Sequence, residues 1–297
     1  MAVRESIVGL SESDTRLSVF RDAFTQFQAL GDDRSYQFFA SVHGLTQPIW
    51  CEHGTSVGNE YQGSLLFLPW HRAFLYYYEL ALQTRLGQRF TQQAAANPTF
   101  ANVGLPWWDW SSDESHRDGI PPAYSAATVN GQPNPLASSE IPVATSQVPI
   151  GVWSNALTQA VRTQLPGVLA GGATPRTVRD PGAPDELPRR STVENIVLSQ
   201  PNYESFTNSA ELVHNDVHGW VGGSMSVVPT SAFDPIFWSH HCMIDRLWYI
   251  WQNGPNGQPP PPQILDVVLA PFPMTVADTL NINLLGYEYA VQTIEFA

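Results

Sequence analysis

The stretch HNDVHGWVGG, residues 214–223, places two histidines four residues apart in a chain of 297 residues that has only eight histidines. Apolar residues recur at intervals of three and four through 203–219, which indicates a helix. On such a helix His214 and His218 lie one turn apart on the same face, a spacing that suits metal binding. The spacing alone is common, so two ordinary core or surface histidines are the alternative.

Similar spacing predicts helices elsewhere in the chain. Glycines end the first two, Pro69 fits the first turn of the third, and Asp234-Pro235 supplies an N-cap and a proline at N1 for the last. Residues 45–66 and 111 to about 190 are expected to be loops, with one helix near 150–165 and short strands near the C-terminus. The expected helices cover about 13–30, 33–43, 69–87, 203–219 and 235–252. The expected fold is mainly α, a four-helix bundle with long irregular loops and few short strands, in one domain over 1–297.

The composition argues against two classes of partner. The chain has 14 Lys+Arg against 27 Asp+Glu, a net charge of −13, and no basic run, so neither nucleic acid nor a membrane is expected to bind. No apolar run is long enough to span a membrane, and the N-terminus lacks the apolar segment of a signal peptide. A soluble, cytoplasmic protein is therefore expected, although a leader already removed would leave the same sequence and keep secretion open. Two cysteines are too few for a disulfide framework.

Further histidines fall on apolar faces of the predicted helices. His43 and His71 do so singly, and His240 and His241 form a pair. One such histidine is usually an ordinary core residue, but six of them are hard to explain separately. Six neutral imidazoles form a nitrogen-only ligand set, which suits copper or zinc. One tetrahedral zinc would leave ligands over, whereas two sites of three histidines use the whole set.

Two longer motifs carry a resemblance to a known family. SLLFLPWHRAFLYYYELAL, residues 64–82, closely resembles the first copper motif of the tyrosinase family, the type 3 copper proteins that include catechol oxidases and molluscan hemocyanins. HNDVHGWVGG, followed by TSAFDPIFWSHHCMIDRLW at 230–248, closely resembles the second. The resemblance extends to VHGL at 42–45, LPWWDW at 105–110 and LGYEYA at 285–290. It implies a helical bundle in which each helix pair holds one of two copper ions, with dioxygen as co-substrate.

The family's copper ligands carry over residue by residue. Those of the first copper match His43 and His71, and those of the second match His214, His218 and His241. We prefer His241 to His240, because the last ligand of the family is the second histidine of the pair.

The remaining ligand of the first copper is where this chain departs from the family. The usual position falls on Gln62, and the nearest histidine is His53 in WCEHG. We expect His53 to be the ligand and 54–62 to be an inserted loop. With Gln62 at the site instead, the first copper would be weak or empty. Cys51 has the family's spacing for a thioether bond to this middle ligand, and a free thiol is the alternative.

The resemblance also implies roles beyond the ligands. Glu211 and Asn215 would hold a water that accepts the phenol proton. Val228 would lie at the substrate pocket, and Phe67 and Phe237 would wall the ligands. Asp245 would orient a ligand imidazole, or else form a structural ion pair.

The function expected from the resemblance is ortho-hydroxylation of monophenols and oxidation of o-diphenols to o-quinones. The alternatives are a catechol or o-aminophenol oxidase without hydroxylase activity, a hemocyanin-like oxygen-binding protein, and a scaffold with zinc or no metal. The chain ends soon after LGYEYA, so no C-terminal shielding domain is expected, which favours an open enzyme. The expected partners are a small phenolic substrate, dioxygen and a copper-delivery protein, and the oligomeric state is left open.

Overall fold

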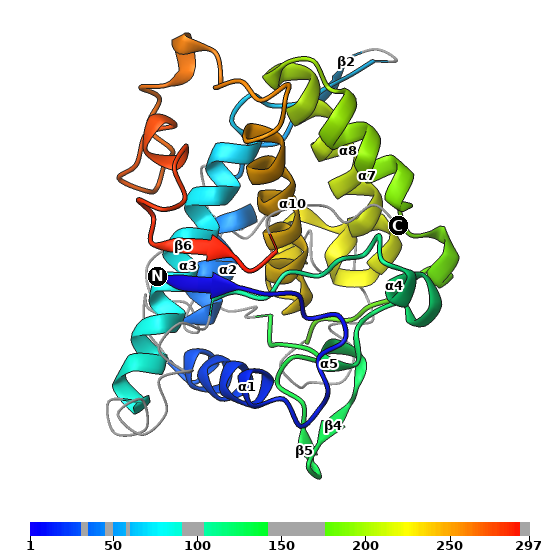
Figure 1. The fold of residues 1–297 in the computed structure, drawn as a ribbon. Coiled ribbons are helices and arrows are strands. Elements are labelled where there is room, and N and C mark those ends of the chain that lie inside the picture. Colours follow the sequence, from blue (N-terminus) through cyan, green and yellow to red (C-terminus); the bar gives the residue numbers. More distant parts are fainter. Residues whose placement is uncertain (31–34, 45–49, 58–59, 91–103, 142–175, 292–297) are drawn as a thin grey trace.

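The computed structural model describes residues 1–30, 35–44, 50–57, 60–90, 104–141 and 176–291, and a bundle of helices forms its centre (Figure 1). Helix α10 lies in the middle of the bundle and contacts both α3 and α8. The main helices are α1 (Thr15–Gln28), α2 (Tyr36–Gly44), α3 (Phe67–Phe90), α8 (Tyr203–Val221) and α10 (Ile236–Gln252). The mainly helical fold predicted from the sequence is confirmed.

Local signals set the ends of these helices. The side chains of Asp14 and Asn202 each accept a backbone N–H from the first turn of the helix that follows, α1 and α8 respectively. Gly222, with a φ of 66°, ends α8 in a conformation that favours glycine. Helix α10 begins at Ile236, one residue later than predicted, and the N–H of Ile236 donates to the carboxylate of Asp234.

The segments predicted as loops contain short elements, so the loop prediction was wrong there. Residues 45–66 include an antiparallel hairpin, β2 (Thr55–Val57) and β3 (Glu60–Gln62). Elements of two to six residues are too short for a hydrophobic period to show, which is why the sequence did not reveal them. The region 111–190 includes α4 (Asp113–Asp118), α5 (Pro122–Ser125), β4 (Thr128–Val129), β5 (Gln132–Pro133) and η3 (Pro184–Glu186). The helix predicted near 150–165 lies outside the described residues.

One longer helix was also missed. Helix α7 (Arg190–Ser199) buries Val193, Ile196 and Val197, whose spacing of three and four is itself a helix signal. The remaining elements are η4 (Gly223–Ser226), α9 (Val228–Ser231), η5 (Pro262–Ile264) and η6 (Ala277–Thr279).

The two ends of the described chain meet beside the bundle. Strand β1 (Ala2–Arg4) pairs in parallel with β6 (Tyr287–Tyr289), which confirms a short strand near the C-terminus (Figure 1). The fully buried Arg4 side chain donates to Glu79 of α3 and to Asp245 of α10. Buried charges are tolerated when they are paired and hydrogen-bonded, so this network joins β1 and β6 to the bundle.

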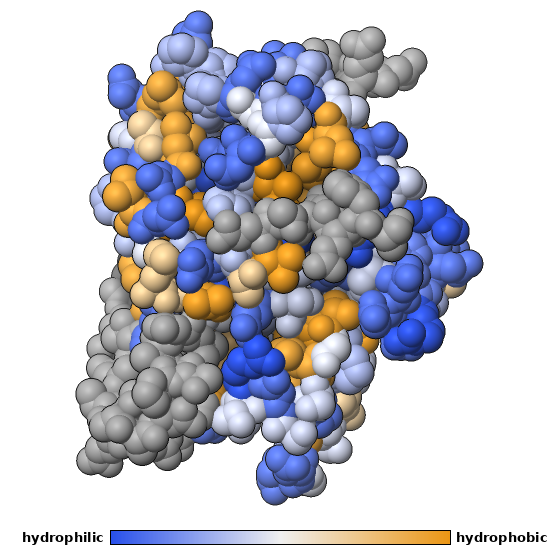
Figure 2. Space-filling model, in the orientation of Figure 1, coloured by the Kyte–Doolittle hydropathy of each residue, from blue (hydrophilic) through white to orange (hydrophobic). Residues whose placement is uncertain are grey.

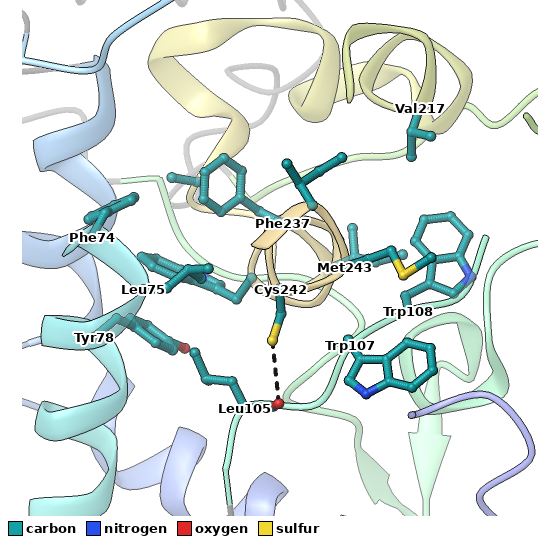
Figure 3. Close-up of a cluster of buried hydrophobic side chains, with 14 of the residues drawn as sticks. Phe74, Leu75, Tyr78, Leu105, Trp107, Trp108, Val217, Phe237, Cys242 and Met243 are labelled. Atoms are coloured by element: carbon teal, nitrogen blue, oxygen red, sulfur yellow. Dashed lines mark hydrogen bonds between the residues drawn. The ribbon is translucent and has the colours of Figure 1, made fainter. Parts of the chain in front are cut away.

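The core between α3 and α10 is filled with aromatic and aliphatic side chains. Figure 3 shows Phe74, Leu75 and Tyr78 facing Phe237 and Cys242. Cys242 is buried, and its Sγ lies 3.5 Å from the carbonyl oxygen of Leu105, so it packs in the core. Full burial of one such apolar side chain contributes about 1.5–3 kcal/mol, which makes this interface a main source of stability.

The surface complements this core. On the face shown in Figure 2, hydrophobic patches are separated by hydrophilic side chains. Scattered exposed apolar residues of this kind are normal on folded proteins. Among the described residues, we find no helix with both the length and the apolarity needed to cross a membrane.

Candidate metal centre

Six histidines predicted as ligands come together between the central helices. His43 lies in the last turn of α2, His71 lies in the first turns of α3, and His241 lies on α10. His214 and His218 share one face of α8, as their spacing predicts. His53 follows α2 in the chain, and its ring centroid is 5.2 Å from that of His71. Five of the six are buried, and His53 is 22% exposed.

The Nε2 atoms of these rings face one another. The Nε2 of His241 is 3.1 Å from that of His214 and 3.2 Å from that of His218. The Nε2 atoms of His43 and His71 are 3.4 Å apart. The structure therefore has a group of three Nε2 atoms and a neighbouring pair, and a ligand atom of His241 also lies within 4.8 Å of those of His43 and His71.

An oxygen acceptor lies beside the Nδ1 of four of these rings, whereas the Nδ1 of His241 has no hydrogen-bond partner. The Nδ1 of His71 donates to the carbonyl oxygen of Phe67 at 2.8 Å, and that of His218 donates to the carbonyl of Met225 at 2.7 Å. The Nδ1 of His43 lies 3.2 Å from the carbonyl of Val228, and that of His214 lies 3.0 Å from Oδ1 of Asn215. A carbonyl oxygen only accepts hydrogen bonds, so Nδ1 carries the proton and Nε2 keeps its lone pair.

This arrangement fits a metal ion. The Nε2 lone pairs of His43 and His71, 3.4 Å apart, cannot hydrogen-bond to each other, whereas a cation between them satisfies both. Burial lowers the pKa of His43, His71, His214 and His241 well below the usual histidine value, and it lowers the pKa of His218 to about 4. These imidazoles are therefore neutral at pH 7, the form that binds metals.

His53 lies beside the pair formed by His43 and His71. Its Nε2 is buried without a hydrogen-bond partner, and its Nδ1 is 3.4 Å from Oε1 of Glu211. Ligand atoms of His43, Cys51 and His53 all lie within 4.8 Å of one another. The backbone of Gln62 lies in β3, but its side chain is outside what the structure describes, so the choice of His53 over Gln62 stays a prediction.

Cys51 is a free cysteine whose thioether bond to His53 stays a prediction. Burial raises the pKa of its thiol to about 12, so the sulfur is protonated at neutral pH.

His240 is the neighbour that the sequence could not separate from His241 by periodicity. Its ring stacks on that of His214, with centroids 5.2 Å apart, and neither of its nitrogens has a hydrogen-bond partner. The Nε2 contacts described above involve His241, which favours His241 as the ligand.

Glu211, the carboxylate predicted to help deprotonate the substrate, lies in the interior of the protein. Glu211 is fully buried on α8, where its oxygens accept the backbone N–H groups of Gly54 and Ser64. Asn215, one turn later, is exposed and lines a cavity at the metal centre. The water that these two residues are predicted to share stays a prediction.

The cavity opens directly onto the histidines. It has a volume of about 270 Å³, enough for a single aromatic ring. Val228 borders it with 44% of its surface exposed, as expected for a pocket residue. The lining residues are His43, His53, His214, Asn215, His218, Gly219, Met225, Ser226, Val228 and Ser231.

Of the three residues predicted to support the ligands, two pack on histidine rings and the third does not. The Phe237 ring stacks on His241 at 4.0 Å, and the Phe67 ring lies 4.7 Å from His71 and 4.9 Å from His214. Asp245 instead bonds to Arg4, Arg72 and two tyrosines, and its hydrogen bonds in the described residues reach no histidine. Of the two roles predicted for Asp245, the structure has the ion pair.

Comparison with known protein families matches the part of the chain that contains all six histidines. A model of the common central domain of tyrosinase matches residues 33–254. A tyrosinase of Streptomyces lincolnensis is 33% identical over an alignment of 233 positions, which covers 73% of this chain and 72% of that protein.

Solved structures share the fold. A functional unit of octopus hemocyanin has a TM-score of 0.68 and 22% identity, over 99% of this chain and 69% of its own. A copper-bound Aspergillus oryzae tyrosinase mutant complexed with L-tyrosine has a TM-score of 0.65 and 20% identity, over 98% of this chain and 92% of its own.

Proposed function

Because this chain belongs to the tyrosinase family of type 3 copper proteins, we propose that it hydroxylates monophenols at the ortho position and oxidises o-diphenols to o-quinones with dioxygen. The single observation that carries this proposal is the cavity of about 270 Å³ that opens onto the buried, neutral histidines. A ring-sized space against a metal centre is what a phenol oxidase requires.

We assign two copper ions to the six histidines. His43, His53 and His71 would hold the first, and His214, His218 and His241 would hold the second. When bound, the copper pair supplies the electrons that reduce dioxygen and activate it toward an aromatic ring. The Nδ1 hydrogen bonds to backbone carbonyls keep the imidazoles aimed at the metals, so the chain provides a preset ligand geometry.

The protein's own part in the reaction is to bind and deprotonate the phenol. The walls of the cavity are largely apolar and imidazole groups, which suit an aromatic ring. We assign Asn215, at the cavity, and Glu211, one turn earlier on α8, to hold the water that accepts the phenol proton. Phe237 and Phe67 exclude further water by packing on the ligand rings.

A catechol or o-aminophenol oxidase without hydroxylase activity is the second candidate. It is favoured by the hydrogen bonds of Glu211 and Asn215, since Gly54, Ser64 and His214 already engage their oxygens. If these bonds persist in the working protein, the base that monophenols need would be weak. The hemocyanin-like reading is less favoured, because the cavity is open enough to leave Val228 at 44% exposure.

Oxygen uptake by the copper-loaded protein tests the proposal. A monophenol such as 4-methylphenol and the matching catechol are supplied in turn, with the metal-free protein as control. Uptake with both supports the proposed function, and uptake with the catechol alone supports the second candidate. Two bound coppers without uptake would leave an oxygen-binding protein.

One partner and a location rest on the sequence alone. We propose that a copper-delivery protein loads the site and that the protein works in the cytoplasm. Oxygen uptake tests neither of these proposals. A pull-down from cells with the metal-free protein as bait would test for the delivery protein, and cell fractionation would test the location.

A further inference from the structure

One short segment contacts a histidine from each of the two groups. This segment, Met225–Ser231, is called the brace segment here, and it runs from the end of η4 through α9. Its Met225 carbonyl accepts the Nδ1–H of His218 at 2.7 Å, and its Val228 carbonyl accepts the Nδ1–H of His43 at 3.2 Å. The two acceptors are three residues apart, so this one segment supplies an acceptor to a histidine of each group.

The brace segment is held in place by buried hydroxyl groups. Thr230 Oγ1 donates to the carbonyl of Ser224 at 2.9 Å and lies 3.2 Å from that of Val227. Thr230 and Ser231 are both at most 1% exposed, so water cannot replace these bonds if they are lost. At the end of α2, a Cβ on Gly44 would lie 2.8 Å from the Val228 oxygen, which shows how closely the two segments approach.

Ser231 lies between the brace segment and His43. Its Oγ donates to the Val228 carbonyl at 3.2 Å and is 3.4 Å from Nδ1 of His43. Because the hydroxyl proton is used on Val228, the oxygen is left as an acceptor for the His43 Nδ1–H. His43 thus has two oxygen acceptors, and both keep its proton on Nδ1 and its Nε2 free for a metal.

We infer that Ser231 is a positioning residue for the first copper site, acting through His43 and the Val228 carbonyl on the brace segment. The inference rests on the proposed copper function and adds a residue that holds no metal itself. Groups that orient a metal-ligating histidine typically contribute 10–100-fold to metal affinity. Since Ser231 contacts His43 but none of the second group in the described hydrogen bonds, its effect should fall on one copper of the two.

The test measures copper affinity in Ser231→Ala with Ser226→Ala as matched control. Ser226 lies on the same segment and lines the same cavity, but its hydroxyl donates to Gly223 and to no histidine. Each purified protein is loaded with Cu(I) and titrated with a chromophoric Cu(I) chelator. In Ser231→Ala, one of the two coppers should leave at about tenfold lower chelator concentration while the other is unchanged. Ser226→Ala should match the wild type, and Ser231→Thr, which keeps the hydroxyl, should restore affinity.

Equal affinities in the Ser231→Ala and Ser226→Ala proteins would overturn the inference, as would equal weakening of both coppers. A second measurement needs no variant, since the side-chain ¹⁵N shifts of the metal-free wild type report which nitrogen of His43 carries the proton. The Nδ1–H form supports the inference, and the Nε2–H form contradicts it. A wild type that does not hold two coppers would count against the proposed function. A wild type that holds two coppers, with the same copper affinities in Ser231→Ala, would count against the inference alone.

Discussion

Acidification should destabilise the metal-free protein, because the metal centre buries neutral histidines. Burial lowers the pKa of His218 from 6.5 to about 4, so between these values the unfolded chain binds a proton that the folded chain does not. Stability contributed by this histidine is complete above pH 6.5 and is lost as the pH falls toward 4. One pKa unit corresponds to about 1.4 kcal/mol, so His218 alone should cost about 3 kcal/mol over this range.

The other buried histidines add to this effect in the same direction. The pKa values of His43, His71, His214 and His241 are also lowered, chiefly by burial, so the total loss should exceed that of His218. A loss of this size is a large part of the 5–15 kcal/mol that stabilises a typical domain.

Denaturant unfolding at pH 7, 6 and 5 measures this slope. The metal-free protein should lose at least about 1.4 kcal/mol per pH unit below 6.5, and His218→Gln should lose less. Copper-loaded protein should keep its stability to lower pH, because the metal competes with the proton. An unfolding free energy that is flat from pH 7 to 5 in the metal-free protein would refute the argument that these histidines are buried and neutral.

Three further predictions concern single substitutions. Asp245→Asn removes the carboxylate that pairs with two buried arginines, so it should lower the unfolding free energy by about 3–5 kcal/mol in denaturant melts; a loss below about 1 kcal/mol would contradict the buried network. Glu211→Gln should reduce monophenol-dependent oxygen uptake by about a hundredfold and leave catechol oxidation nearly intact, and an equal loss on both substrates would show that Glu211 supports only the fold. Gly219 lines the cavity, and a Cβ on it would meet nothing within 4 Å. Gly219→Phe should therefore change the unfolding free energy by less than about 0.5 kcal/mol, while its ring occupies the cavity and raises KM for phenols; an unchanged KM would place the substrate elsewhere.

The helical part of the site could be predicted from the sequence because its signals are local. Histidines on an apolar helix face point into the bundle, so the positions of His71, His214 and His218 follow from periodicity and spacing. The same periodicity could not separate His241 from His240, since adjacent residues on a buried helix can both face inward. There the prediction of His241 rests on the resemblance to the family, and the Nε2 distances favour it.

The parts that could not be predicted depend on contacts between distant residues. Strand β1 has three residues and pairs with β6, which lies near the other end of the chain. Such short strands show no hydrophobic periodicity, and the sequence of one does not indicate which strand it pairs with. The carbonyls that orient His43 and His218 come from the brace segment, and no sequence pattern specifies which backbone oxygen a side chain will reach. His53 lies outside any helix, which is why its role rests on the family's pattern and on its place beside His43.

The amount of copper bound per chain tests the central claim most directly. After loading and extensive dialysis, the wild type should retain two copper ions. His71→Ala should retain only the second copper, and His241→Ala should retain only the first. His116→Ala, in α4 and outside the metal centre, should still retain two. Retention of a single zinc ion by the wild type, or of fewer than two coppers, would contradict the assignment of two three-histidine copper sites.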